Sequence, residues 1–235
     1  MEAINAEEPI DKVFVQKGLR GELAKELESL MRKKGISFSY VPPEKLNRLS
    51  GSNHQGVVAS ISPISFHVLE ELVEGVVATK DAPFFLLLDQ LSDVRNFGAI
   101  IRSAECTGID GIIIQKSGSA PVTSDTIKTS AGAVFNVPIA KVDHLKDAVF
   151  YLQASGIRVV AATEKTNKLL YDASLTGGLA IVMGAEDTGI SPSIIKAADD
   201  AVKLPMLGEI GSLNVSVACG VLLYEAVRQR QKKTK

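Results

Sequence analysis

The sequence has little of what marks several classes of protein. Its 235 residues include two cysteines, no tryptophan and only 5% aromatic residues. Cys106 and Cys219 lie far apart and form no CxxC pair, so a metal site or a redox motif has little support. We expect both to be buried, reduced thiols within helices, because cysteine is commonly buried. We predict no bound metal.

Long apolar runs and an excess of one charge are also absent. No stretch reaches the roughly 18 apolar residues of a membrane helix, and the opening MEAINAEEPIDK is acidic where a signal peptide needs a basic and then an apolar run. We therefore expect a cytoplasmic protein that binds no membrane. The formal net charge of −1 does not by itself indicate a nucleic-acid partner, which is better recognised by a local basic patch.

The first part of the chain alternates between strand and helix patterns. β-branched and aromatic runs predict strands, and amphipathic spacing between them predicts helices. The strands are expected at 12–16, 36–41 and 51–61, and the helices at 21–34 and 44–49. We assign residues 1–64 to a small α/β domain. Residues 65–83, where a helical pattern dissolves into TKDAP, are predicted to be a linker.

The rest of the chain, residues 84–235, has a more regular alternation. Short continuous apolar runs, separated by amphipathic helical segments, indicate strands that are covered on both faces. These runs are 84–89, 111–115, 157–163, 179–184 and 201–206. We predict a doubly wound, mostly parallel α/β domain, with its ligand beyond the carboxyl ends of the strands.

Two of the expected strands lead directly into loops with polar side chains. After the first strand, Asn96 is placed to cap a helix, on which Arg102 and Glu105 are close enough for a surface ion pair. The loop GAEDTGISP, residues 184–192, combines glycines with two acidic residues. It matches neither GxGxxG nor GxxxxGK[ST], and its acidity favours a neutral or cationic ligand over a phosphate.

A third loop, residues 208–214, precedes a long apolar stretch. Ser212 is predicted to be the N-cap of a helix over 213–230. That role does not explain Asn214, an indifferent helix former in the first turn. Gly208 and Gly211 permit close approach of the backbone to a ligand. A binding site at this helix entrance is therefore plausible from the sequence.

These loops resemble the motifs of the SpoU family of RNA ribose 2′-O-methyltransferases. The family pattern D-x(3)-D-P-x-N-x-G-x(3)-R-x-A is matched by Asp89, Asp93, Asn96, Gly98, Arg102 and Ala104. The pattern G-x-E-x-x-G is matched by Gly184, Glu186 and Gly189. LPMLGEIGSLNVS, residues 204–216, is similar to the last motif, and TSAGAVFNVP, residues 129–138, to the segment between them. NHQGVVA, residues 53–59, resembles the end of the family's substrate-binding domain, which is related to ribosomal protein L30e.

The resemblance implies a SPOUT-type α/β domain with a C-terminal trefoil knot, preceded by an L30e-like RNA-binding domain. It also implies that the knotted loops bind S-adenosylmethionine and that a homodimer shares the active site. The implied cofactor contacts are Thr163, Gly184, Leu204, Met206 and Leu213. The implied catalytic group is Arg102, oriented with the ribose by Asn96, Glu186, Ser212 and Asn214.

Arg102 has two possible roles, as a base or as a clamp on a neighbouring RNA phosphate. We prefer the clamp, or a phosphate-assisted proton transfer, because a guanidinium group keeps its proton. His54, in the first domain, is either a proton carrier or a structural or RNA-contacting residue. We favour the second reading because His54 lies outside the knotted domain.

Family members with the extra domain typically methylate a guanosine of 23S ribosomal RNA, and this is the implied activity. One alternative is a transfer RNA methyltransferase, and another is a non-catalytic RNA-binding factor in ribosome assembly. A nicotinamide-dependent oxidoreductase is less supported because the glycine fingerprint is missing.

The sequence departs from the family pattern in two places. Val94 stands where proline is usual, and we expect this to loosen the loop before Asn96. The chain also begins close to a segment that relatives precede with a strand, so the first domain is expected to be trimmed or to lack that strand.

Overall fold

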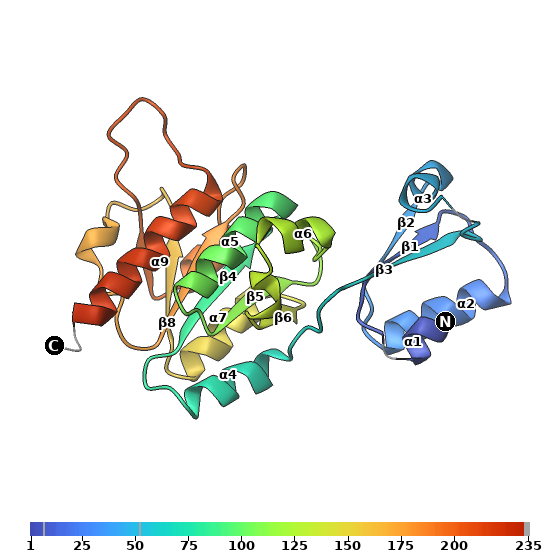
Figure 1. Ribbon diagram of the computed structural model, residues 1–235, viewed down its shortest axis with the longest axis horizontal. Coiled ribbons are helices and arrows are strands. Elements are labelled where there is room, and N and C mark those ends of the chain that lie inside the picture. Colours follow the sequence, from blue (N-terminus) through green and yellow to red (C-terminus); the bar gives the residue numbers. More distant parts are fainter. Residues whose placement is uncertain (7, 52, 233–235) are drawn as a thin grey trace. The chain divides into compact units, whose positions relative to one another are not determined.

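The computed structural model describes residues 1–6, 8–51 and 53–232, and it divides into two compact units (Figure 1). Unit 1 is Met1–Ser65 and unit 2 is Phe66–Lys235. Among the described helices, none is both long and apolar enough to cross a membrane.

Unit 1 is a three-stranded sheet with helices. Its elements are α1 (Glu2–Asn5), β1 (Ile10–Gln16), α2 (Glu22–Lys33), β2 (Phe38–Val41), α3 (Pro43–Leu49) and β3 (Val57–Ile61). The central strand β1 pairs in parallel with β2 and antiparallel with β3. Val13 and Val15 on one face of β1 pack with Leu27 and Met31 of α2. The strand and helix order predicted for this unit is confirmed, with shorter second and third strands.

Unit 2 is built on a six-stranded sheet with the strand order β6-β5-β4-β8-β7-β9. Every ladder in this sheet is parallel. The strands are β4 (Phe84–Asp89), β5 (Gly111–Gln115), β6 (Ile139–Val142), β7 (Arg158–Ala162), β8 (Leu179–Gly184) and β9 (Asp200–Val202). The parallel α/β prediction is confirmed, and all five predicted runs contain a strand.

Helices cover both faces of this sheet (Figure 1). They are α4 (Leu69–Val77), α5 (Val94–Cys106), α6 (Ser124–Thr129), α7 (Leu145–Ala154), α8 (Pro192–Ala197) and α9 (Val215–Lys232), with the short 3-10 helices η1 (Ala133–Phe135) and η2 (Leu170–Asp172). α4, α7 and α8 share one core with alternate residues of the strands. The remaining strand residues point to the other face, where α5 and α9 pack against each other.

The segment expected to be a linker, residues 65–83, contains α4. Leu69 and Val73 of this helix are buried in the core with α7 and the sheet. Most of the segment is therefore packed within unit 2.

Two strand predictions differ from the structure at the edges of the sheet. β9 ends at Val202, whereas the predicted run extended to Met206. Pro205 lacks an N–H group for a ladder, and the chain leaves the sheet before it. β6 was not predicted. It has four residues, of which only Ile139 and Ala140 are buried, so its apolar signal is short.

Candidate functional site

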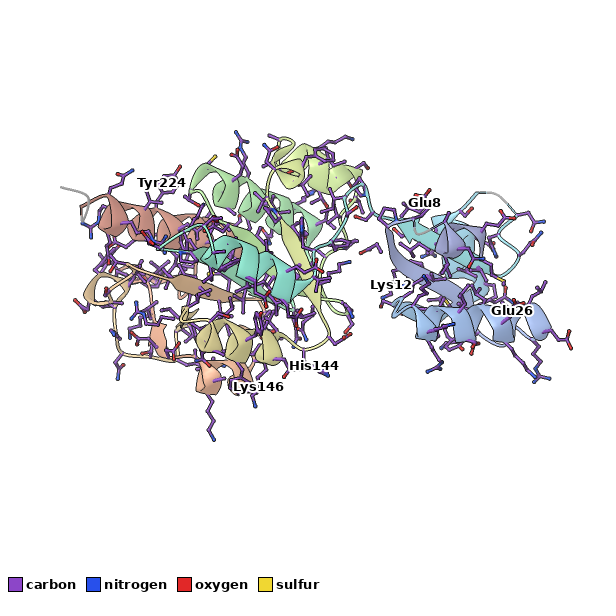
Figure 2. The ribbon with its side chains drawn as sticks, turned by 90° about the horizontal axis from the view of Figure 1, so that it is seen from below. Glu8, Lys12, Glu26, His144, Lys146 and Tyr224 are labelled. Carbon is purple, nitrogen blue, oxygen red and sulfur yellow. The ribbon has the colours of Figure 1, made fainter. Side chains whose placement is uncertain are left out.

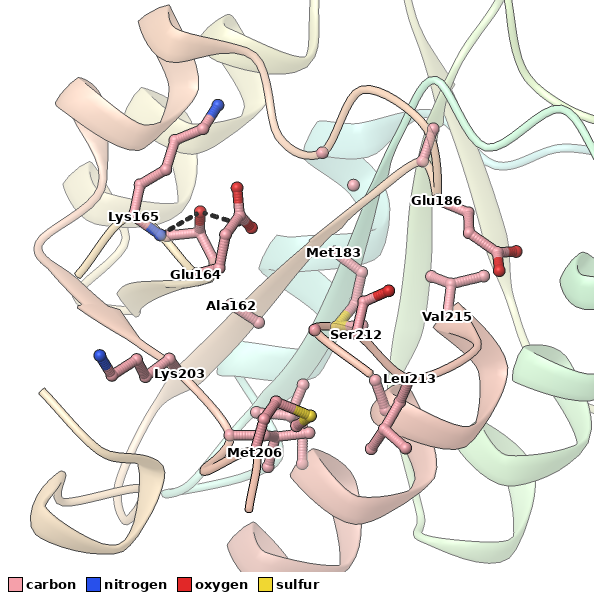
Figure 3. A pocket seen from close by; sticks show the side chains of 18 of the residues that line it. Ala162, Glu164, Lys165, Met183, Glu186, Lys203, Met206, Ser212, Leu213 and Val215 are labelled. Atoms are coloured by element: carbon pink, nitrogen blue, oxygen red, sulfur yellow. Dashed lines mark hydrogen bonds between the residues drawn. The ribbon is translucent and has the colours of Figure 1, made fainter. Parts of the chain in front are cut away.

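A cavity of about 750 Å³ opens at the carboxyl ends of β7, β8 and β9 (Figure 3). Its walls come from residues 162–165 at the end of β7, 183–189 at the end of β8, 203–206 after β9, 211–213 before α9, and the first half of α9. Segments far apart in the sequence thus meet at one edge of the sheet. This is the edge at which α/β proteins bind their ligands.

The cavity collects all five residues that the family resemblance assigned to a cofactor. Thr163, Gly184, Leu204, Met206 and Leu213 all line it. Two of the implied catalytic residues, Glu186 and Ser212, line it as well (Figure 3). Asn96, Arg102 and Asn214 are not among the lining residues.

The loop after β8 has a shape that only glycine permits at its start. A Cβ atom on Gly184 would overlap the backbone of Gly189 and Ile190. Ala185 and Gly189 form a bridge across the turn, and the amide of Gly189 donates to the carbonyl of Ala185 at 2.9 Å. The turn folds back so tightly that its backbone, rather than side chains, forms much of this wall.

The charges around the cavity suit a ligand with a net positive charge. Three acidic residues, Glu164, Glu186 and Asp187, line it against two basic ones, Lys165 and Lys203. The sequence analysis missed both lysines. Lys165 could have been noticed because it comes soon after the predicted strand 157–163, whereas Lys203 was hidden inside the predicted run 201–206, of which only the part up to Val202 is a strand.

The start of α9 is capped by Asn214, so the prediction that Ser212 caps this helix is wrong. The side-chain Oδ1 of Asn214 accepts hydrogen bonds from the amides of Ser216 at 3.0 Å and Val217 at 3.4 Å. It also accepts from the Ser216 hydroxyl at 2.6 Å. The helix begins at Val215, two residues later than predicted, which leaves Ser212 at the cavity wall.

The start of α5 is likewise capped by a residue other than the one predicted. Asp93, not Asn96, is the N-cap, and its carboxylate accepts from the Asn96 amide at 2.7 Å. Val94 is the first residue of the helix, a position that suits proline, and the expected loosening of the loop without proline stays a prediction. Asn96 Oδ1 accepts from Asn214 Nδ2 at 3.0 Å. This bond ties the starts of the two helices together.

Arg102 is exposed on α5, away from α9. In the described part of the chain it makes no ion pair with Glu105, contrary to expectation. Ser103 lines the groove between α5 and α9. Arg102 precedes it by one residue, so its side chain starts about 100° away from that of Ser103 around the axis of α5. Arg102 lies one turn beyond Gly98, whose Cβ position is filled by Thr129 of α6. The side chain of Arg102 therefore leaves α5 toward the α6 side of the helix.

His54 in unit 1 has both ring nitrogens in hydrogen bonds. Nδ1 accepts from the Gly56 amide at 3.0 Å, and Nε2 lies 2.9 Å from Asn47 Oδ1. With Nδ1 accepting, Nε2 is the donor. This arrangement supports a structural role in the turn before β3.

The two cysteines differ in exposure. Cys219 is fully buried, and burial raises the pKa of its thiol to about 12. Cys106 is exposed at the end of α5, so the expectation that both are buried is wrong for this residue. Among the described residues, no group of three or more His, Cys, Asp or Glu side chains is placed to hold a metal ion.

The chain has two units, and the second is a parallel α/β unit with a cavity at its strand ends. These features define a ligand-binding α/β protein with an additional N-terminal unit. Family comparisons narrow this class. Residues 83–224 match the SpoU rRNA methylase family, and residues 1–67 match the domain described as RNA 2′-O ribose methyltransferase substrate binding. The chain belongs to the SpoU rRNA methylase family.

Individual relatives agree with this assignment. The chain is 38% identical to the 23S rRNA (guanosine-2′-O-)-methyltransferase RlmB of Vibrio cholerae, over 93% of this chain and 89% of the relative. It is 33% identical to the putative TrmH family tRNA/rRNA methyltransferase YacO of Bacillus subtilis, over 98% and 92%. The crystal structure of the SpoU methyltransferase AviRb from Streptomyces viridochromogenes in complex with AdoMet matches with a TM-score of 0.64 at 25% identity, over 99% of this chain and 87% of that one.

Proposed function

We propose that this protein transfers a methyl group from S-adenosylmethionine to the ribose 2′-hydroxyl of a guanosine in 23S ribosomal RNA. The observation that carries the proposal is the cavity, because residues of the glycine turn and the last family motif meet there. The relatives named 23S rRNA (guanosine-2′-O-)-methyltransferase match both units and supply the choice of RNA. Such a substrate would place the protein in the cytoplasm.

The residues of the cavity fit S-adenosylmethionine. When bound, this cofactor supplies an electrophilic methyl group. Its sulfonium and ammonium groups outweigh its one carboxylate, which matches a cavity with three carboxylates and two ammonium groups. Met183, Leu204 and Leu222 provide apolar wall for the rest of the ligand. The segment after β9 lines the same cavity as those after β7 and β8, as the family's trefoil knot would require.

Arg102 is the residue that we assign to the RNA. A guanidinium group can hold a phosphate beside the ribose in a fixed position through its paired N–H donors. Positioning of this kind accounts for much of the catalysis when a weak nucleophile must meet an electrophile in line. Glu186 and Ser212 at the cavity wall, with the linked Asn96 and Asn214, would orient the reacting ribose.

The position of Arg102 supports a homodimer with shared active sites. Val215, Ala218 and Leu222 of α9 line the cavity, whereas Ser216 and Gly220 line the groove with α5. α9 therefore lies between the cavity and α5, and Arg102 is on a further side of α5. A second copy would bring its own Arg102 to this cavity.

The exposed side of α9 offers a surface for that copy. Val217 is 53% exposed, Val221 38% and Tyr224 55%, so an apolar stripe runs along the helix. Tyr224 is labelled on this helix in Figure 2. Apolar side chains gathered in this way are typical of protein interfaces.

A transfer RNA substrate is the second candidate. The A. aeolicus TrmH/SpoU tRNA modifying enzyme matches with a TM-score of 0.60 at 29% identity. However, that match covers 71% of this chain, whereas the 23S rRNA relatives cover 93%. The N-terminal unit therefore distinguishes this chain from that tRNA enzyme, although the putative tRNA/rRNA methyltransferase YacO shares the unit, and the choice of ribosomal RNA rests on the relatives named for 23S rRNA.

The experiment is methyl transfer from labelled S-adenosylmethionine to a 23S transcript. Arg102→Ala should lower the rate by about 100-fold or more, as expected when a charged group at the reacting centre is removed. Arg95→Ala is the matched control, because Arg95 is also exposed on α5. Full activity of Arg102→Ala would contradict the assigned role.

A further inference from the structure

A second cavity, of about 280 Å³, opens at the same edge of the sheet as the first. It lies at the carboxyl ends of β4 and β5 and at the turn between β6 and α7. The family resemblance assigns no ligand to these residues. Asp89, Gln90, Gln115, His144, Lys146 and Ser191 are among its lining residues. We call this cavity the base pocket.

The inner wall of the base pocket carries fixed hydrogen-bonding groups. Asp89 is only 1% exposed, and its Oδ2 accepts from the Ser191 amide at 2.7 Å. At the exposed rim, Gln90 Nε2 donates to the Ser191 hydroxyl at 3.3 Å. The buried Oε1 of Gln115 has no hydrogen-bond partner among the described residues. A buried acceptor without a partner is costly, and a ligand N–H group would satisfy it.

This set of groups selects the chemistry of the ligand. Asp89 and Asp147 disfavour a phosphate inside the pocket, and no group of acidic or histidine side chains in the described chain could hold a metal ion. Carboxamide and carboxylate oxygens pair with the N–H groups at the edge of a nucleobase. The pocket has the volume of about nine water molecules, enough for one base.

The mouth of the pocket adds two groups suited to RNA. His144 and Lys146 are exposed in the turn before and at the start of α7, and Figure 2 labels both on the same side of unit 2. An imidazole ring can stack on a base, as RNA-binding proteins commonly arrange. The lysine can meet the phosphate of the same nucleotide.

One loop connects the base pocket to the first cavity. The turn from Gly184 to Gly189 lines the first cavity, and the same loop ends at Ser191 in the base pocket. Asp89 also pairs in register with Gly184 across β4 and β8. The first cavity is centred near β7 and the base pocket near β4 and β5, which are two and three strands away in the sheet. The distance between the two pockets is therefore about 10–15 Å. A stacked RNA strand covers this distance in about three or four nucleotides, and an extended strand in fewer.

We propose that the base pocket binds an unstacked base of the RNA substrate, a few nucleotides from the methylated ribose. Gln115 and Asp89 accept hydrogen bonds from the edge of the base, and His144 stacks on its face. This assignment rests on the proposed RNA methylation, and it names a contact that selects the RNA sequence near the target.

The test measures RNA binding and methylation separately, with the full-length protein and a 23S transcript. Gln115→Leu removes the amide at similar size, and His144→Ala removes the stacking ring. Each variant should raise the Kd for the transcript, measured without cofactor, by about tenfold, and raise KM by a similar factor. Both kcat and the affinity for S-adenosylmethionine should stay unchanged. Gln231→Leu, at an exposed glutamine of α9, is the matched control.

Wild-type Kd and KM in both variants would overturn the proposal. If Gln115→Leu also loses cofactor binding, the variant is misfolded, and His144→Ala at the surface decides alone. If the wild-type protein binds the transcript but methylates no RNA, the proposed function fails, while the Kd comparison still tests the base pocket.

Discussion

At the scale of single residues, the side-chain amide of Asn214 serves two partners. Its oxygen caps α9, and its nitrogen donates to Asn96 on α5. The capping role answers why an indifferent helix former occupies this position. The link to Asn96 gives the residue a second effect, on the geometry of the proposed RNA site.

Two substitutions of Asn214 should separate these effects. Asn214→Ser keeps a capping oxygen but is too short to reach Asn96, so we expect near wild-type thermal stability and lower methyl transfer. Asn214→Ala loses both and should cost about 1 kcal/mol of stability as well. Thermal melts and initial rates measure the two effects. A Ser variant with full activity would show that the link to Asn96 is unimportant.

The two thiols should differ in reactivity. A pKa of about 12 keeps the buried Cys219 protonated far above neutral pH, whereas Cys106 is exposed. At pH 8 we expect a thiol reagent to modify one cysteine of the native protein and both after unfolding. Mass spectrometry of the labelled peptides identifies the sites. Rapid modification of Cys219 in the native protein would contradict its position in the core.

At the scale of elements, the strands that could be predicted best from the sequence are those that are completely buried. β4 is buried at all six positions, and its continuous apolar run made the strand recognisable. β6 is a four-residue edge strand with two half-buried residues, and nothing in so short a stretch distinguished it from a loop. The start of α9 was also mispredicted, because Ser212 and Asn214 are both good caps and their residue types alone do not decide between them. In the structure the cap is Asn214, which also bonds Asn96.

The start of α5 offers a stabilising substitution. Val94 is the first helical residue, where proline is well tolerated, and Asp93 before it has the extended conformation (φ −78°, ψ 121°) that proline requires of its predecessor. Val94→Pro should therefore stabilise the protein by about 0.4–1 kcal/mol, through the entropy of the unfolded chain. The melting temperature should rise by about 1–4 °C. A lower melting temperature would mean that Val94 makes contacts that this account omits.

At the scale of the whole molecule, motif matching identified the cavity residues, but it could not place Arg102 relative to them. The motif positions of Gly184 and Leu213 are confirmed as cavity walls, while their contacts with a cofactor stay predictions. Arg102 belongs to the same motif set, yet α9 separates its helix from the cavity. A linear pattern carries no information about which copy of the chain supplies a residue.

Mixed dimers test whether the site is shared. Chains with Arg102→Ala keep an intact cavity, and chains with Leu213→Arg keep Arg102 but have a blocked cavity. Each variant alone should be inactive. Together they should recover about a quarter of wild-type activity, because half of the random dimers have one complete site. No recovery would mean that Arg102 acts within its own chain.

The central claim is the methylation of ribosomal RNA, and the most direct measurement is nucleoside analysis by mass spectrometry. The purified protein is incubated with S-adenosylmethionine and either a 23S transcript or transfer RNA, and the digested RNA is analysed for methylated nucleosides. We predict 2′-O-methylguanosine at one position of the 23S transcript and none in transfer RNA. Methylation of transfer RNA alone, or no methylated nucleoside from protein that binds the cofactor, would contradict the account.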